Sequence, residues 1–423
     1  MNGNGPNRRD LLRATALASA GATAAAAFPG TVAPRAARAQ ARRPTREVRS
    51  GAGPVRVESV ARGLVHPWGI AFLPGDGRML VTERPGRLRI VTAEGRVSEP
   101  LRGVPAVFAQ GQGGLLDVVL DPGFALNRRL YLSYAEPGEG GGVASTAVAR
   151  ARLNEGATGL EAVEVIFRQE PKVSGNNHFG SRIVFSREGA LFITLGERFK
   201  FQPAQDLLSD LGKIVRINPD GSIPSDNPFV GRQDARPGIW SYGHRNIEAA
   251  ALHPDTGALW VAEMGPRGGD ELNIPEAGRN YGWPLVSWGR HYNGEAIPSP
   301  RTRPDLADAV YQWTPVISPS GMIFYTGDAF PDWRGNILIG GLSARAIVRL
   351  VLDGTRVRAE DRIAIGERIR DVAQGPDGTI YALTDDPRGE ILRVTPMGPM
   401  TGSVPSSAGG TAASGSGGGA GRR

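Results

Sequence analysis

A strand–turn–strand pattern that recurs six times is the feature of this sequence that most limits its possible folds. In each copy a short run of alternating apolar residues leads into a turn rich in Pro, Asp and Gly, and a second such run follows. The copies cover residues 69–83, 116–134, 181–197, 249–263, 321–341 and 372–385. Their first strands lie 48 to 73 residues apart, which is the spacing expected for one sheet per copy.

Six copies of this kind predict an all-β fold, a six-bladed β-propeller of four-stranded antiparallel blades. A β-sandwich would need fewer, evenly short strands, and a helical solenoid would show a 3.6-residue period that this sequence lacks. The 59 glycines and 33 prolines fit many short strands joined by turns. We expect the propeller to cover residues 55–397, closed by pairing Val55–Val60 with Glu390–Val394. Loops at one end of its channel then bring together residues that are distant in sequence.

Both ends of the chain differ in composition from the repeats. Residues 1–39 are typical of a twin-arginine export signal: NRRDLLR at 7–13, an Ala-rich apolar run, and a small-x-small cleavage site at 37–39. The alternative is a disordered basic tail. The export signal predicts a periplasmic or secreted protein. Residues 40–54 are expected to be a linker and the Gly/Ser-rich residues 398–423 a disordered tail.

Net charge and cysteine content narrow the classes of function. Residues 1–39 contain five arginines and one aspartate, so the remainder has 44 basic and 41 acidic side chains, a net charge of +3. This small charge favours neither a nucleic-acid partner nor stable membrane insertion, and it permits a monomer. The absence of cysteine excludes disulfides, thiolate metal sites, iron–sulfur clusters and covalently attached c-type haem.

The segment 241–284 concentrates polar and charged residues between strand-like runs. It contains YGHRN, EMGPRGGDE and NYGWP in that order. Further motifs are GQGGLLDVVLDP at 111–122, GNNHFGSRIVF at 175–185, LGKIVRINPDGSIPSDNPF at 211–229 and RIRDVAQGPDG at 368–378. Together they resemble the soluble, calcium-dependent pyrroloquinoline quinone (PQQ) sugar dehydrogenases, and most closely the aldose sugar dehydrogenase branch. The resemblance extends from about His66 to Val394.

This resemblance implies an enzyme that oxidises aldose sugars at the anomeric carbon to lactones. Hydride passes to PQQ, and the electrons then leave to an external acceptor. The resemblance also implies that His178 is the general base and that Arg245 contacts the quinone. Histidine suits the base because its unperturbed pKa lies near neutrality. Glu197 has two interpretations: it orients the imidazole of His178, or it is exposed at the surface.

The other four histidines are weaker candidates. His66 and His253 each precede a proline and are interpreted as turn residues. The side chain of His244 is interpreted as pointing away from the channel, although it adjoins Arg245. His291 is the next candidate for the base. No two histidines have the spacing of zinc ligands.

PQQ carries three carboxylates and an ortho-quinone, so its pocket needs several cations. Arg368 and Arg370 are expected on one side of a strand, where their guanidinium groups can bind carboxylates; a pair of surface arginines is the alternative. The quinone-binding residues that the resemblance implies are Gln112, Arg245, Asn246, Tyr292, Leu342, Ser343, Arg345, Arg368 and Arg370.

At one of these positions the chain departs from its relatives. Many of them have a lysine where this chain has Ser343. Arg345 follows two positions later and is expected on the same strand face. Either Arg345 takes over the charge, or the pocket has one cation fewer.

The resemblance implies calcium as well. Backbone carbonyls of Gly265 and Pro266 are expected to hold the ion that binds the quinone, and Glu271 and Tyr281 a second, structural ion. Carbonyl and carboxylate oxygens are the ligands that calcium prefers. On its own, however, an acidic pair such as Asp270-Glu271 is usually solvated.

Two other classes of function share the predicted fold, because a fold does not determine a function. One is a calcium-dependent six-bladed lactonase or esterase, which needs a cage of Glu, Asn and Asp side chains where the motifs here supply arginines. The other is a propeller that binds sugars or proteins without catalysis, for which Ser343 is the one indication.

Overall fold

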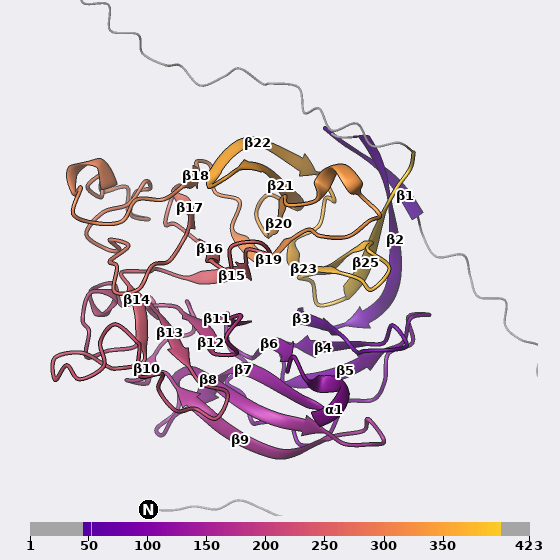
Figure 1. Ribbon diagram of the computed structural model, residues 1–423, viewed down its shortest axis with the longest axis horizontal. Helices are drawn as coiled ribbons and strands as arrows, with labels where there is room; N and C mark the ends of the chain where they lie inside the picture. Colours follow the sequence, from indigo (N-terminus) through magenta and orange to yellow (C-terminus); the bar gives the residue numbers. More distant parts are fainter. Residues whose placement is uncertain (1–44, 52, 399–423) are drawn as a thin grey trace, which may run out of the picture. The chain divides into compact units, whose positions relative to one another are not determined.

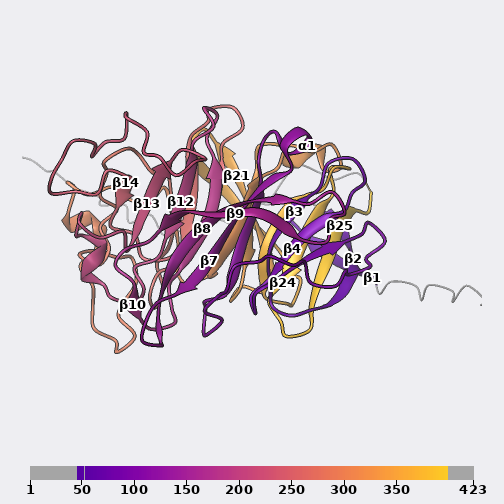
Figure 2. The same ribbon diagram turned by 90° about the horizontal axis from the view of Figure 1, so that it is seen from below.

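The computed structural model describes residues 45–51 and 53–398. These residues form six antiparallel sheets around a central channel, which confirms the predicted six-bladed β-propeller (Figure 1). Seen from the side, the strands cross the ring and the connecting loops collect at its two faces (Figure 2). The expected export signal at 1–39 lies outside the described residues, as does the expected tail after residue 398. In the described part of the chain, no helix has both the length and the apolarity needed to cross a membrane.

Blades one to three follow one another along the chain, and their strands are given from the channel outward. Blade one contains β3 (Pro67–Phe72), β4 (Met79–Glu83) and β5 (Arg87–Val91). Blade two contains β6 (Leu115–Leu120), β7 (Arg129–Pro137) and β8 (Val143–Leu153), with β9 (Leu160–Arg168) and β10 (Val173–Ser174) both paired to β8. Blade three contains β11 (Gly180–Phe185), β12 (Leu191–Leu195), β13 (Lys213–Ile217) and β14 (Ile239–Tyr242).

Blades four to six complete the ring in the same order. Blade four contains β15 (Ile247–Leu252), β16 (Leu259–Glu263), β17 (Asp270–Asn273) and β18 (Tyr311–Trp313). Blade five contains β19 (Pro319–Phe324), β20 (Ile337–Gly341), β21 (Ala346–Asp353) and β22 (Arg356–Ile363). Blade six contains β23 (Ile369–Gln374), β24 (Ile380–Thr384), β25 (Gly389–Pro396), β2 (Gly53–Leu64) and β1 (Thr45–Ser50). The helices in the described part of the chain are α1 (Phe124–Asn127) and three 3₁₀ turns, Gln202–Ala204, Pro300–Thr302 and Pro331–Trp333.

Blade six joins the two ends of the propeller. Strand β2 pairs with β25, with Val55 opposite Pro396 and Val57 opposite Val394. The pairing that the sequence predicts for ring closure is therefore present. Strand β1 adds to the outer edge of β2, so the range expected to be a linker includes a strand.

The first strand of every blade has the same irregularity near its start. In β3, β6, β11, β15, β19 and β23 the register shifts within the first few residues, as in a β-bulge. These six strands also contact one another in a closed ring. A bulge changes the direction of the side chains beside it. Six bulges at equivalent positions therefore repeat one local geometry around one end of the channel.

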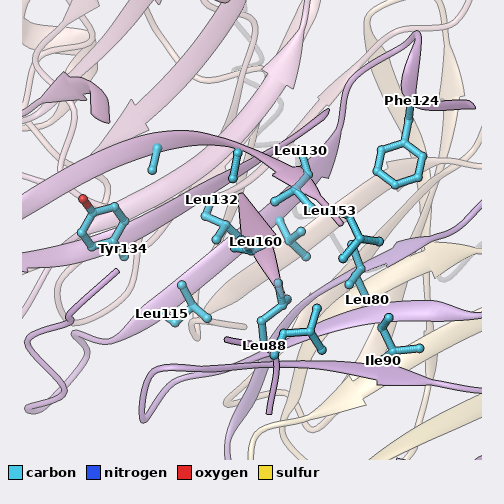
Figure 3. Packing of buried hydrophobic residues seen from close by; sticks show 14 of the residues in the cluster. Leu80, Leu88, Ile90, Leu115, Phe124, Leu130, Leu132, Tyr134, Leu153 and Leu160 are labelled. Atoms are coloured by element: carbon cyan, nitrogen blue, oxygen red, sulfur yellow. The ribbon is translucent and has the colours of Figure 1, made fainter. Parts of the chain in front are cut away.

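Apolar side chains fill the spaces between neighbouring blades. Between blades one and two, Leu80 and Leu88 pack against Leu115, Leu130 and Leu132, and all five are fully buried (Figure 3). The alternation of apolar residues in the sequence produces this arrangement, because alternate side chains of a strand share one face. Each buried leucine contributes about 1.5–3 kcal/mol. Tight packing of this kind holds the loops at the channel end in fixed positions.

Candidate active site

One backbone hydrogen bond is repeated in all six blades at the same end of the channel. A residue near the end of each second strand donates its N–H to the carbonyl of a residue at the head of the first strand. The pairs are Arg84–His66, Ala135–Gly114, Arg198–His178, Met264–Asn246, Leu342–Ser318 and Asp385–Arg368, with N–O distances of 2.8–3.2 Å. We call the donors the strand-end ring and the acceptors the strand-head ring. Four residues predicted for the site, His178, Asn246, Leu342 and Arg368, belong to these rings.

His178 lies in the strand-head ring and is 5% exposed. Its Nδ1 is 2.5 Å from Oε1 of Glu197, which is fully buried. The other oxygen of Glu197 accepts hydrogen bonds from the N–H groups of Lys200 and Phe201. Glu197 is therefore not at the surface, and its contact with Nδ1 leaves Nε2 as the free nitrogen of the imidazole.

The pKa of His178 is lowered, because burial disfavours the charged imidazolium more strongly than Glu197 favours it. Nearby Arg245 lowers this pKa further. The imidazole is consequently neutral near pH 7, which is the form that a general base requires.

Three neighbours hold the backbone around His178. The N–H of His178 donates to Oε1 of Gln112 at 2.6 Å, and Oδ1 of Asn246 accepts from the N–H of Gly180 at 3.0 Å. Gly196 lies so close to the carbonyl of His178 that a side chain there would collide with it. His178 itself has a left-handed backbone with φ of +54°, which costs energy in a non-glycine residue. The surrounding contacts compensate for that strain.

Arg245 lies next to the turn predicted to bind metal. Its Nη1 donates to the carbonyls of Met264 and Gly265, both at 2.8 Å, and its Nη2 donates to the hydroxyl of Tyr292 at 3.1 Å. The guanidinium lies 5.2 Å from the ring centre of Trp283, within cation–π range. Its Nε is buried and has no partner among the described residues.

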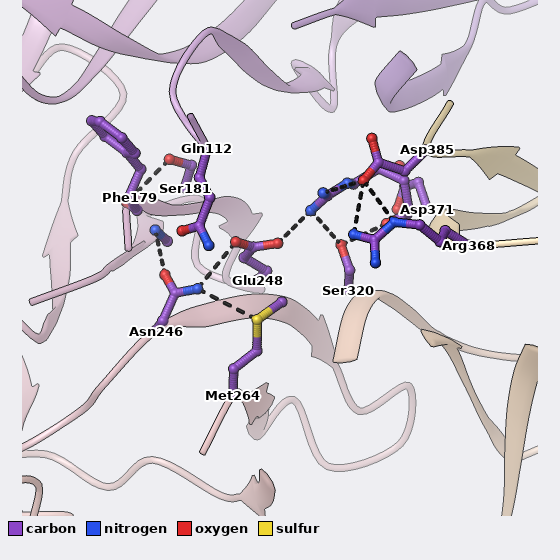
Figure 4. Close-up of polar contacts among 12 residues, drawn as sticks. Gln112, Phe179, Ser181, Asn246, Glu248, Met264, Ser320, Arg368, Asp371 and Asp385 are labelled. Atoms are coloured by element: carbon purple, nitrogen blue, oxygen red, sulfur yellow. Dashed lines mark hydrogen bonds and ion pairs between the residues drawn. The ribbon is translucent and has the colours of Figure 1, made fainter. Parts of the chain in front are cut away.

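Arg368 and Arg370 face a common protein acceptor, although Arg368 lies just before β23 and the register of that strand shifts after Ile369. Both contact Oδ2 of Asp385, at 3.1 and 2.9 Å, but Arg368 is half exposed whereas Arg370 is buried. Arg370 also pairs with Glu248, and Glu248 in turn accepts a hydrogen bond from Asn246 at 3.0 Å (Figure 4). Burial opposes ionisation of Asp385, yet Arg370, His66 and Arg368 outweigh it and hold the pKa of that carboxyl well below its usual range.

Several members of this site were not predicted from the sequence. Glu248 and Asp385 neutralise much of the charge of Arg368 and Arg370. Nδ1 of His66 bonds to Asp385 at 2.9 Å, so His66 is more than a turn residue. Side chains alternate along a strand, so Glu248 is expected on the same side of the chain as Asn246. This spacing could have predicted Glu248 as a member of the site. His244 is fully buried and its Nδ1 lies 3.0 Å from Glu263, while its expected direction away from the channel stays a prediction.

The loop that carries Ser343 and Arg345 differs from the prediction. Residues 342–345 form the turn between β20 and β21, so Arg345 does not share a strand face with Ser343. Arg345 is exposed, and its Nε donates to the carbonyl of Gly366 at 2.7 Å. Ser343 bonds to Ser318 at 2.9 Å. Leu342 is buried. The expectation of a shared face is wrong because the strand ends at Gly341.

The four residues predicted to bind calcium line one small pocket beside Arg245. These residues are Gly265, Pro266, Glu271 and Tyr281. Burial and the neighbouring Glu263 raise the pKa of Glu271 well above its usual value. Asn273 donates to both carboxylates, and its Oδ1 has no partner among the described residues.

The same part of the chain shows no metal cage of side chains. Among residues 45–51 and 53–398, no group of three or more His, Cys, Asp or Glu side chains could hold a metal ion. A cation beside Arg245 would therefore depend on backbone carbonyls together with the carboxylates of Glu263 and Glu271.

A cavity of about 240 Å³ opens beside Arg245 and is lined mostly by aromatic rings. Its lining residues are Phe199, Phe201, Arg245, Pro266, Trp283, His291, Tyr292, Asn293 and Glu295. The ring of Phe199 lies 5.2 Å from the imidazole of His178, edge to face. Tyr292 and His291 thus line the same cavity as Phe199, the residue that contacts the base. Nothing in the sequence distinguished Phe199 and Phe201 from core residues.

A six-bladed propeller with a buried histidine–carboxylate pair and several arginines at one mouth of its channel is equipped as an enzyme. The glucose/sorbosone dehydrogenase family model matches residues 64–393, and the chain belongs to this family. It is therefore an oxidoreductase of the sugar dehydrogenase class, which confirms the predicted family.

Individual relatives agree with this assignment. Aldose sugar dehydrogenase YliI of Escherichia coli is 47% identical over 346 residues, covering 81% of this chain and 93% of the relative. A crystal structure of a glucose dehydrogenase is 50% identical, with a TM-score of 0.78 over 80% of this chain and 98% of that one. The PQQ-bound aldose sugar dehydrogenase of Streptomyces coelicolor is 31% identical, with a TM-score of 0.66 over 80% of this chain and 98% of that one.

Proposed function

We propose that this protein is a PQQ- and calcium-dependent aldose sugar dehydrogenase that oxidises the anomeric carbon of its substrate to a lactone. The observation that carries this proposal is the buried His178–Glu197 pair beside Arg245, whose Nε is left without a partner. The PQQ-bound relative from Streptomyces coelicolor supports the choice of cofactor.

The donor groups of the site fit an anionic quinone. Buried Nε atoms of both Arg245 and Arg370 lack partners among the described residues, and such atoms are costly unless a ligand accepts from them. Arg368 is half exposed and still has free donors. The residues that would hold the quinone are Gln112, Arg245, Asn246, Tyr292, Leu342, Ser343, Arg368 and Arg370.

The acceptor groups beside Arg245 fit calcium. Glu263 and Glu271 repel one another in a buried pocket, which a divalent cation would relieve. The carbonyls of Gly265 and Pro266 would complete an oxygen set for the ion at the quinone, and Glu271 and Tyr281 would serve a second ion. Bound there, calcium would supply Lewis acidity and the quinone would accept a hydride.

His178 would perform the proton transfer. In this mechanism Nε2 takes the proton from the anomeric hydroxyl while the C1–H electron pair leaves as hydride, so that the C1–O bond becomes the lactone carbonyl. Glu197 stabilises the imidazolium that forms and keeps the ring oriented. The guanidinium of Arg245 would stabilise the negative charge that the quinone gains when it accepts the hydride. The aromatic cavity would bind the sugar and exclude water.

Two further parts of the proposal concern the surroundings of the enzyme. Electrons would pass to an external carrier, since the sequence contains no haem-attachment motif. Export through the twin-arginine route would place the protein in the periplasm or outside the cell.

Reconstitution of the purified protein tests this function. We expect sugar-dependent dye reduction only when PQQ and calcium are both added, and loss of that activity on chelation. Each component omitted in turn serves as the control. Activity with a nicotinamide cofactor, or activity that chelation leaves unchanged, would contradict the proposal.

A further inference from the structure

Arg84 occupies a position equivalent to residues already placed in the site. It follows β4 directly and belongs to the strand-end ring, as do Met264, Leu342 and Asp385. Its N–H donates to the carbonyl of His66 at 3.0 Å, and its own carbonyl accepts from the N–H of Leu115 at 3.1 Å. Both backbone groups are therefore held, and the side chain starts from a fixed point at the channel mouth.

The guanidinium of Arg84 has no hydrogen bond or ion pair with any described residue, although the residue is partly buried. Burial lowers the pKa of Arg84, and the charges that act on it most are Asp385, Arg370, Glu248 and Arg368. The carbonyl of His66 accepts from the N–H of Arg84, and Nδ1 of His66 bonds to Asp385 at 2.9 Å. Arg84, from blade one, therefore lies beside the cluster of Arg368, Arg370, Asp385 and Glu248, which we call the arginine corner. In that corner both carboxylates already contact Arg370, which leaves Arg84 without an anion of its own.

The glycine motif at 111–114 leaves room for this side chain. A Cβ on Gly114 would collide with the backbone and with Cγ of Arg84, so a residue other than glycine would displace the arginine. Gly114 also has a φ of +144°, which side chains rarely adopt. The same motif carries Gln112, whose side chain holds the backbone of His178. Arg84 and the base are thus positioned by one short loop.

We propose that Arg84 binds a carboxylate of the quinone cofactor and is a cofactor-binding residue that the sequence motifs did not reveal. The proposal rests on the function proposed above. A guanidinium group binds a carboxylate through two parallel hydrogen bonds, and Arg84 is the arginine beside this corner that has no competing acceptor among residues 45–51 and 53–398. Arg345 is unsuited to the role because its Nε donates to Gly366 and its Nη2 lies 3.8 Å from Glu367 at the rim.

Titration of the apoprotein with PQQ in the presence of calcium tests this role, with quenching of tryptophan fluorescence as the readout of Kd. Arg84→Gln keeps the aliphatic stem and removes the charge, and we expect it to weaken binding about 10- to 100-fold. Arg345→Gln is the matched control and should change Kd less than about twofold. Arg84→Lys should retain part of the affinity that Arg84→Gln loses, because lysine keeps the positive charge but lacks the two parallel N–H donors of a guanidinium group.

The trimethyl ester of PQQ supplies the second arm, because it lacks the carboxylate charges. Arg84→Gln should weaken binding of PQQ but leave binding of the ester nearly unchanged. An Arg84→Gln protein with wild-type affinity for PQQ, or with equal losses for PQQ and its ester, overturns the role of Arg84 alone. A wild-type protein that binds no PQQ overturns the proposed function and this role with it.

Discussion

At the scale of single residues, the chemistry of the site depends on one buried carboxylate beside one buried imidazole. Glu197 accepts two backbone N–H groups through one oxygen and contacts Nδ1 of His178 through the other. Because the backbone N–H groups hold the carboxylate in place, its second oxygen fixes both the tautomer and the orientation of the His178 imidazole. The base is therefore arranged before any substrate binds.

Replacement of Glu197 tests this arrangement through pH dependence. Activity needs neutral His178, so it is present above the pKa of that residue and is lost as the pH falls through it. Glu197 raises this pKa against the larger effect of burial, and Glu197→Gln removes that influence. We expect the acid limb of the profile of kcat/KM against pH to move to lower pH, with kcat reduced at least about tenfold.

Glu188→Gln is a suitable control for this experiment, because Glu188 is exposed in the turn between the same two strands, β11 and β12. Its profile should match that of the wild type. An acid limb that stays in place or moves to higher pH in Glu197→Gln would contradict the assigned role of Glu197.

At the scale of strands and turns, Asp270 links two loops that meet at the site. From β17, its Oδ1 accepts from the N–H of Gly265 at 2.8 Å, and its Oδ2 accepts from Ile317 and Ser318 at 2.8 and 2.7 Å. The Gly265-Pro266 turn of blade four is thereby tied to the head of β19 in blade five. The position of a candidate metal turn thus depends on a neighbouring blade.

Elements with strong alternation were predictable, as was the pairing that closes the ring, but side-chain contacts between blades were not. The six first strands could be located because apolar residues alternate in each, and His178 and Arg245 lie in motifs at their heads. The pairing of Arg370 with Glu248 joins residues 122 apart in the sequence, and that of His66 with Asp385 joins residues 319 apart. Such side-chain contacts form only when the ring closes, so no pattern within a short stretch of sequence predicts them.

At the scale of the whole propeller, buried charges join blades across the channel. Arg182 contacts Asp117 and Asp371, both at 3.2 Å, and its Nε donates to the carbonyl of Glu248 at 2.7 Å. These four residues lie on the first strands of blades two, three, four and six. Burial raises the pKa of Asp371 to about 6 in spite of Arg182. Burial of these charges therefore lowers the folding stability of the propeller, while their contacts hold the four blades in position around the site.

Ring closure by blade six should control the stability of the whole propeller. Val57 is 2% exposed on β2 and packs into the core of blades five and six. Val57→Asp would bury an unpaired charge there, and we expect it to lower the free energy of unfolding by about 3–5 kcal/mol. Urea denaturation measures the change.

The neighbouring Arg56 is exposed on the same strand and provides the comparison. Arg56→Asp should alter the free energy of unfolding by no more than about 0.5 kcal/mol. If the two variants were equally stable, the pairing of β2 with β25 would not be what holds the ring closed.

The rate of sugar oxidation by His178→Ala at saturating PQQ and calcium tests the role of His178 directly. If His178 is the general base, dye reduction should be about 10²–10⁴-fold slower than in the wild type, while the Kd for PQQ stays within about twofold. A His178→Ala protein that reduces dye at close to the wild-type rate would show that His178 is not the general base. His291, across the aromatic cavity, would then be the next residue to examine as the base.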